Sequence, residues 1–173
     1  PTRRSSDLEH IVGVRKEIGR ADDVRLTLGG HGDPLLSERC FDVIAAARQA
    51  GIEAIEVETD LLTAYETIVH RLVEAKVDVV TINVPAITTQ TYAAVMGVDG
   101  LARVIANVRA LLSDRKSRGQ GVPLVAPMFV KTAANLAEME GWHDQWLRAL
   151  GSAVIKGPSD YAGQIPDVSV ADM

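Results

Sequence analysis

Hydrophobic residues recur along the chain in two alternating patterns. Short apolar runs predict β-strands, and the nearly continuous run at residues 77–84 is typical of a strand buried on both faces. The predicted strands are residues 24–28, 52–57, 77–84, 124–130 and 153–155. Between these runs, apolar positions return every three or four residues, as on one face of an α-helix. The clearest predicted helix carries Leu61, Leu62, Tyr65, Ile68, Val69, Leu72 and Val73 on that face.

Residues with known preferences for helix ends set the limits of the other predicted helices. One runs from Ser37, as N-cap, to residue 50, and Gly51 is its predicted stop. Further helices are predicted at residues 9–19, after residue 84 with a break near 97–100, and at 135–150.

Strands that alternate with helices at this spacing predict a parallel α/β sheet with right-handed crossovers. In such sheets the chemistry collects at the carboxyl ends of the strands. The segments that follow the predicted strands contain most of the unusual residues of the chain. These segments are residues 29–34, 58–61, 83–86, 130–135 and 156–160.

Composition narrows the class of protein further. The chain has 173 residues, 47% of them hydrophobic and 24% charged, as expected for one globular domain. A net charge of −5 gives no reason to expect nucleic acid or a membrane surface as partner. No apolar stretch has the length of a membrane span. Cys40 is the only cysteine, which excludes a disulfide framework and favours a reducing, cytoplasmic setting.

Both ends of the chain differ from the rest. Residues 1–8 lack an initiator Met, resemble a translated sequencing adapter, and are interpreted as a non-native leader. Residues 9–164 are expected to form the core domain. Residues 165–173 form a polar tail, interpreted as the start of a linker to a further extension.

A glycine-rich turn follows the first predicted strand, in the segment LGGHGDPLL at residues 28–36. This segment resembles the Gly-Gly-Glu-Pro turn of the radical S-adenosylmethionine superfamily, with Asp33 in place of the commoner Glu. Other features of the family follow in the same order over residues 22–165. They are the leucine pair Leu61-Leu62, the segment from Thr91 to Gly97, Asn107 to Leu111, Asn135 with Glu138, and residues 159–163.

The resemblance implies a partial (β/α)6-type barrel of parallel strands, truncated at both ends. It implies an enzyme that reductively cleaves S-adenosylmethionine at a [4Fe–4S] cluster to give a 5′-deoxyadenosyl radical. The cysteines that hold the cluster are expected upstream of residue 9, so this piece alone is expected to be inactive. Residues 159–163 resemble a branch with a cysteine-rich SPASM-type extension, which implies a peptide or protein substrate and an electron donor as partners.

The resemblance also implies which residues bind S-adenosylmethionine. Backbone carbonyls of the glycine-rich turn would accept hydrogen bonds from the methionyl ammonium group, because glycine permits the unusual backbone angles and the close approach. The turn residues are Gly30, His31, Gly32, Asp33 and Pro34. At the ends of later strands, Asn83 would bind a ribose hydroxyl and Val130 would pack against adenine. Asn135 is expected either to cap its helix or to touch the ligand.

Three other possibilities remain open on the sequence. An ordinary barrel lyase or epimerase would use Asp33, Lys131 and Lys156 at strand ends, with Lys156 buried as a Schiff-base residue. A metal hydrolase would need further ligands beside His31 and Asp33. Alternatively, the chain is a non-catalytic binding module that shares only the scaffold. The catalytic hydrogen donor or acceptor is not identified by any of these patterns.

Overall fold

The computed structural model describes residues 24–64 and 66–159. The predicted leader, the helix at residues 9–19 and the linker at 165–173 lie outside this part. In chain order, the elements are β1 (Arg25–Leu28), η1 (Pro34–Leu36), α2 (Cys40–Gln49), β2 (Ala54–Thr59), α3 (Glu66–Glu74), β3 (Val79–Asn83), α4 (Thr89–Met96), α5 (Leu101–Ser117), β4 (Leu124–Val130), η2 (Leu136–Glu138), α6 (Met139–Leu150) and β5 (Val154–Lys156).

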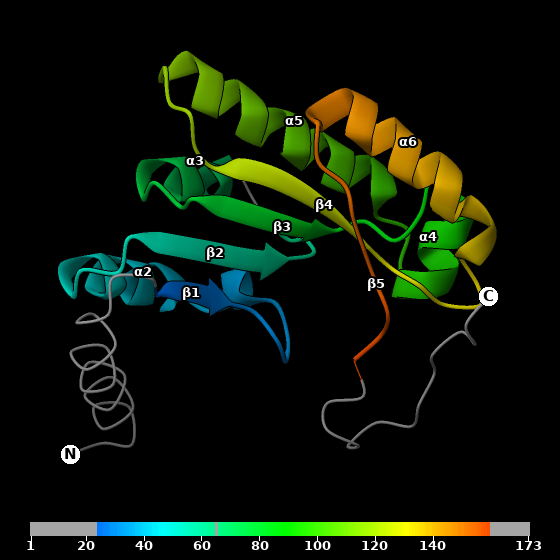
Figure 1. Ribbon diagram of the computed structural model, residues 1–173, viewed down its shortest axis with the longest axis horizontal. Coiled ribbons are helices and arrows are strands. Elements are labelled where there is room, and N and C mark those ends of the chain that lie inside the picture. Colours follow the sequence, from blue (N-terminus) through cyan, green and yellow to red (C-terminus); the bar gives the residue numbers. More distant parts are fainter. Residues whose placement is uncertain (1–23, 65, 160–173) are drawn as a thin grey trace.

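The described strands form one parallel sheet in the order β1-β2-β3-β4-β5. Each strand is followed by at least one helix before the next begins, and Figure 1 shows the arrows of β1, β2 and β3 pointing the same way. The predicted α/β class is therefore confirmed. The loops that follow the strands gather at one end of the sheet, as a parallel arrangement requires.

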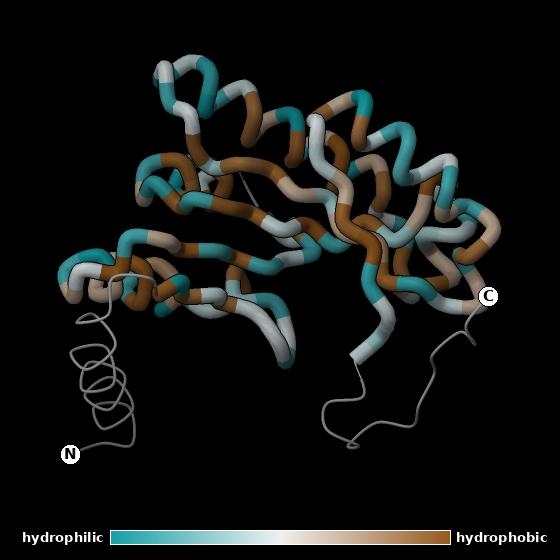
Figure 2. Tube along the Cα trace, in the orientation of Figure 1, coloured by the Kyte–Doolittle hydropathy of each residue, from teal (hydrophilic) through white to brown (hydrophobic). Residues whose placement is uncertain are grey.

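Alternate residues of each strand face two different environments. On one face, apolar side chains pack beneath the helices and are almost fully buried. They include Ile55, Val57, Val80, Ile82, Val125 and Phe129. Figure 2 shows this hydrophobic character along β3 and β4.

The opposite face of the sheet carries a polar cluster around Glu56. Its carboxylate accepts hydrogen bonds from the hydroxyls of Thr27 (3.1 Å) and Thr81 (2.6 Å), and it forms an ion pair with Arg25 (3.5 Å). These contacts join β1, β2 and β3 side by side. Apolar side chains are thus buried mainly on the face of the sheet that the helices cover. The opposite face, called the inner face below, carries the hydrogen-bonded cluster around Glu56.

Two helices end at the glycines that the sequence predicts, but α2 does not begin at its predicted N-cap. Gly51 follows α2 with a φ of 87°, and Gly97 ends α4 with a φ of 72°. Ser37, however, ends η1, and α2 begins three residues later at Cys40 without a side-chain cap. Pro34 starts a short 3-10 helix, and Ser37 is the residue at which that helix ends. The prediction that Ser37 is the N-cap of α2 is therefore wrong.

Two further boundaries differ from the apolar pattern. Strand β2 covers Ala54–Thr59, two residues later than predicted, because the polar residues Glu56 and Glu58 continue it on the inner face. Helix α3 is described over Glu66–Glu74, Tyr65 lies outside the described residues, and Leu61 lies in the preceding loop although it is fully buried. No helix of the described residues is long and apolar enough to cross a membrane.

Candidate functional site

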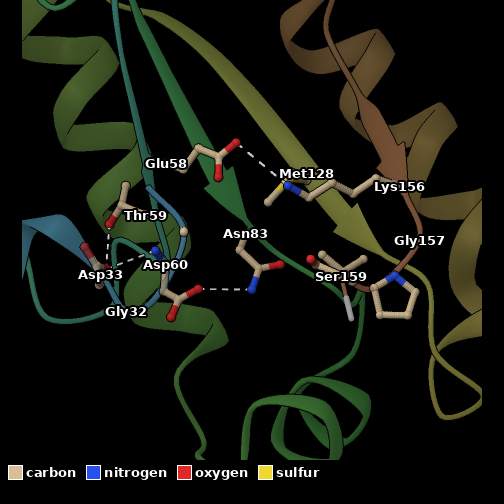
Figure 3. A pocket seen from close by; sticks show the side chains of 13 residues that line it. Gly32, Asp33, Glu58, Thr59, Asp60, Asn83, Met128, Lys156, Gly157 and Ser159 are labelled. Atoms are coloured by element: carbon tan, nitrogen blue, oxygen red, sulfur yellow. Dashed lines mark hydrogen bonds and ion pairs between the residues drawn. The ribbon is translucent and has the colours of Figure 1, made fainter. Parts of the chain in front are cut away.

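A pocket of about 400 Å³ opens at the carboxyl ends of the strands. Residues from the turn after β1, the ends of β2, β3 and β4, and the segment after β5 line it, as Figure 3 shows. The lining residues are Gly30, Gly32, Asp33, Glu58, Thr59, Asp60, Asn83, Met128, Val130, Lys156, Gly157, Pro158 and Ser159.

The turn after β1 depends on its glycines. Gly30 has a φ of 101° and Gly32 a φ of 83°, values at which other residues are strained. Gly29 is needed for a different reason, because a Cβ there would lie 2.8 Å from the Glu58 carboxylate and 2.9 Å from its Cβ. The glycines therefore let the turn curve over the pocket while the Glu58 side chain lies against it.

Asp33 fastens this turn to the end of β2. One carboxylate oxygen accepts a hydrogen bond from the Leu35 backbone N–H (2.9 Å) and caps η1. The other oxygen accepts from the Thr59 hydroxyl (2.7 Å) and from the Asp60 backbone N–H (3.0 Å). The carboxylate thereby holds two strand ends together and is not directed at a ligand.

Asp60 and Asn83 meet across the ends of β2 and β3. The Asn83 amide nitrogen donates a hydrogen bond to an Asp60 carboxylate oxygen (3.0 Å) and lies 3.7 Å from the Met96 sulfur. Burial raises the pKa of Asp60, the Asn83 hydrogen bond lowers it, and the Asp33 charge raises it, with a net increase. The Asn83 carbonyl oxygen is buried and has no hydrogen-bond donor among the described residues.

A second unsatisfied polar atom, the hydroxyl of Tyr92 on α4, belongs to the same neighbourhood. Tyr92 is fully buried, and its hydroxyl has no partner within the part of the chain that the structure describes. Burial, followed by the Asp60 charge, raises the pKa of Tyr92 to about 12. The phenol therefore stays protonated and can act as a hydrogen-bond donor beside the pocket.

Lys156 lies at the far side of the pocket, 3.7 Å from the Glu58 carboxylate. Its side chain is 45% exposed. A Schiff-base lysine is activated by desolvation in an apolar site, which this exposed, ion-paired side chain lacks. The geometry therefore disfavours the lyase hypothesis.

The structure brings most of the predicted ligand residues to one place. The five that line the pocket are Gly30, Gly32, Asp33, Asn83 and Val130. The two that do not line it are His31, which is exposed, and Pro34, which begins η1.

Asn135 is a structural brace, and the predicted helix cap by its side chain is wrong. It is fully buried, and it makes no side-chain cap for η2. Its amide nitrogen donates to the carbonyls of Pro85 (2.9 Å) and Val130 (2.9 Å), and its oxygen accepts from Thr132. All of its polar atoms are thus used to tie the end of β3 to the end of β4.

Glu138 makes a second set of hydrogen bonds between the same loops. It accepts hydrogen bonds from the backbone N–H of Ile87 (2.5 Å) and from the backbone (3.2 Å) and hydroxyl (2.6 Å) of Thr88. Asn135 and Glu138, which the resemblance groups as one motif, therefore both connect the loop after β3 to the segment after β4.

The remaining polar candidates lie away from the pocket. His70 is exposed on α3, where it contacts Asp114 and Arg118 of α5, and His143 lies on α6 beside Asp144. Cys40 is buried in α2, and burial raises the pKa of its thiol to about 11. Among the described residues, no group of three or more His, Cys, Asp or Glu side chains is placed to hold a metal ion.

Asp60 and Glu58 are the charged residues of the pocket that the sequence analysis did not single out. Both follow the apolar part of β2, where a carboxylate at a strand end is the available signal.

Known proteins resemble the chain in both sequence and fold. No protein-family model matches it. A probable GTP 3′,8-cyclase from Metallosphaera sedula is 28% identical over 130 residues. The solved structure described as native anSMEcpe with bound AdoMet superimposes with a TM-score of 0.67 at 11% identity, over 86% of this chain. The chain is related to the radical S-adenosylmethionine enzymes.

Another solved structure has a similar fold. A domain of the pyruvate-formate lyase-activating enzyme from Bacteroides vulgatus matches with a TM-score of 0.55 at 19% identity, over 80% of this chain and 88% of that one. The chain spans only 38% of the Metallosphaera sedula relative and 42% of the anSMEcpe chain. It therefore corresponds to less than half the length of these two relatives.

Proposed function

We propose that this chain is part of the core of a radical S-adenosylmethionine enzyme and that its pocket holds S-adenosylmethionine. The observation that carries the proposal is the pocket itself. A glycine turn with two left-handed residues and a buried, unpartnered carbonyl oxygen of Asn83 meet at the carboxyl ends of parallel strands. These are acceptor groups, and the cofactor's ammonium and ribose groups are donors.

The glycine-rich turn suits the methionyl ammonium group. Its backbone carbonyls can approach a ligand closely because Gly30 and Gly32 have no side chain to block them and adopt positive φ angles. Asp33 contributes indirectly, since its three hydrogen bonds fix the turn against β2. In this assignment Pro34 sets the start of η1, and His31 contributes only its backbone.

Asn83 and Val130 suit the nucleoside part of the cofactor. The Asn83 carbonyl oxygen lacks a donor, and an unsatisfied buried acceptor costs about 1–3 kcal/mol that a ligand hydroxyl would recover. Asn83 ends β3, which lies between β2 and β4. Val130 ends β4 and offers an apolar surface for a base. When bound at a reduced cluster, S-adenosylmethionine supplies a 5′-deoxyadenosyl radical.

The residues of this chain do not fit an iron–sulfur cluster. The chain has a single cysteine, Cys40, which is buried in α2 and carries a raised pKa, whereas a cluster is held by several thiolates. The cluster ligands would therefore come from sequence upstream of residue 9 in the parent protein.

A peptide or protein is the substrate class that we propose for the parent enzyme, with an electron donor as second partner. One of the similar structures is described as anSMEcpe with bound AdoMet and a Kp18Cys peptide. Residues 159–163 also resemble the start of a SPASM-type extension.

The test is to express the chain together with its flanking coding sequence under anaerobic conditions, and to measure iron content, visible spectrum and 5′-deoxyadenosine formation. A [4Fe–4S] spectrum with reductive cleavage of S-adenosylmethionine is the expected result. A colourless protein whose upstream sequence lacks the three cysteines would contradict it and favour the binding module.

A further inference from the structure

The orientation of one side-chain amide decides what the pocket offers to a ligand. An Asn side chain presents either a carbonyl oxygen, which accepts a hydrogen bond, or an NH₂ group, which donates two. At Asn83 the nitrogen points to the Asp60 carboxylate and the Met96 sulfur, at 3.0 and 3.7 Å. In Figure 3 the oxygen is turned away from Asp60, toward the other side of the pocket.

Asp60 enforces this orientation because an ionised carboxylate can only accept hydrogen bonds. If the Asn83 amide rotated by 180°, its oxygen would face the carboxylate oxygen, and two acceptors would be in contact. A neutral amide at position 60 would lift this restriction, since its own NH₂ group could donate to the Asn83 oxygen.

The carboxylate of Asp60 is itself held in place by the surrounding loop. The Asp60 backbone N–H donates to Asp33 (3.0 Å), and the Leu61 backbone N–H donates to the Thr59 hydroxyl (2.9 Å). Asn107 on α5 donates to the carbonyls of Leu61 (2.8 Å) and Ala64 (3.0 Å). The loop on both sides of Asp60 is therefore fixed before any ligand binds.

We propose that Asp60 is a positioning residue that locks the Asn83 amide with its carbonyl oxygen facing the pocket, so that the site selects a ligand hydroxyl. This inference rests on the proposed function, and it assigns the selectivity of the nucleoside position to a side chain outside the predicted ligand set. The carboxylate acts through Asn83, and its effect is a preference between ligands.

The test compares two nucleosides, adenosine and 2′,3′-dideoxyadenosine, by NMR titration of the 173-residue chain. Wild type should bind adenosine about tenfold more tightly, because the dideoxy compound leaves the Asn83 oxygen buried and unpaired. In Asp60→Asn this ratio should fall to about twofold or less, because the amide can turn. The side-chain NH₂ signals of Asn83 should shift in the variant as well.

Two matched variants separate selectivity from folding. Asp99→Asn makes the same substitution on an exposed loop residue and should keep the wild-type ratio. The double variant Asp60→Asn with Asn83→Asp exchanges the two side chains. The carboxylate at position 83 then presents an acceptor toward the pocket, and the amide at position 60 donates to it. This variant should restore the preference for adenosine. A role of Asp60 in stability alone would lower the melting temperature without changing the ratio.

The outcomes distinguish this inference from the proposed function. An equal adenosine preference in wild type and Asp60→Asn would overturn the positioning role and leave the cofactor assignment intact. A wild-type chain that binds both nucleosides equally would also overturn it. No binding of either nucleoside to the wild-type chain would overturn the cofactor assignment and this inference together.

Discussion

Leu61 adopts a backbone conformation that normally favours glycine. Its φ is 51°, in the left-handed region, and its side chain is fully buried. Asn107 holds the Leu61 carbonyl, so the conformation is maintained by a hydrogen bond from α5 and by burial of the leucine.

This conformation predicts an inverted order of stability at position 61. Leu61→Ala and Leu61→Gly both remove the buried side chain and should each lose about 2–5 kcal/mol of unfolding free energy. Glycine should nevertheless be more stable than alanine by about 1 kcal/mol, because only alanine is strained at positive φ. Urea denaturation of both variants measures the difference.

The control for that comparison is Ala45, an exposed residue in the middle of α2. There Ala45→Gly should destabilise the chain by about 0.5–1 kcal/mol, the ordinary helical order. If alanine were the more stable residue at position 61 too, the positive φ of Leu61 would impose no strain.

The site also shows what a single residue reveals in a sequence. The family resemblance pointed to Gly30, Gly32 and Asn83, and all three line the pocket. Asp60 and Asn135 were misjudged because hydrogen bonds between loops determine their roles. Those partners, such as Pro85 for Asn135, are up to 50 residues away along the chain.

At the scale of elements, the connections after β3 and β4 are joined by Glu138. Burial raises the pKa of this carboxyl, but hydrogen bonds from Thr88, Ile87 and Thr91 together outweigh it, and the pKa lies below the usual 4.5. A carboxyl with a lowered folded-state pKa stabilises the fold above its unfolded pKa, and that contribution is lost as the pH falls through the folded-state pKa.

Glu138→Gln should therefore lower the melting temperature at pH 7 and have little effect once the pH is well below 4.5. Thermal unfolding of wild type and variant across this range measures the convergence. Glu140→Gln, on an exposed residue of α6, should change the unfolding free energy by less than about 0.5 kcal/mol at either pH. A Glu138→Gln deficit that stayed constant on acidification would exclude the ionised form as the stabilising species.

Element types were easier to predict than element ends. Short apolar runs identified the strands and apolar periodicity identified α3, because burial in the core produces both patterns. The start of α2 and the extension of β2 depend on Pro34 and on inner-face glutamates, which the apolar pattern does not register.

At the scale of the whole molecule, the chain has the pocket that we propose for the cofactor but only one cysteine, which is too few thiols for a cluster. The isolated 173-residue chain should therefore form no 5′-deoxyadenosine from S-adenosylmethionine after anaerobic treatment with iron, sulfide and dithionite. Chromatographic detection of the product measures this, with the longer protein as positive control. Cluster-dependent product from the isolated chain would show that other residues ligate iron.

The polar cluster around Glu56 has a consequence for the loss of an edge strand. A single carboxylate serves both neighbours of β2, because one oxygen meets Thr27 and Arg25 of β1 and the other accepts a hydrogen bond from Thr81 of β3. Removal of β1 would leave one Glu56 oxygen without these partners at the new edge of the sheet. The first strand therefore cannot be trimmed from this sheet without a compensating change at Glu56.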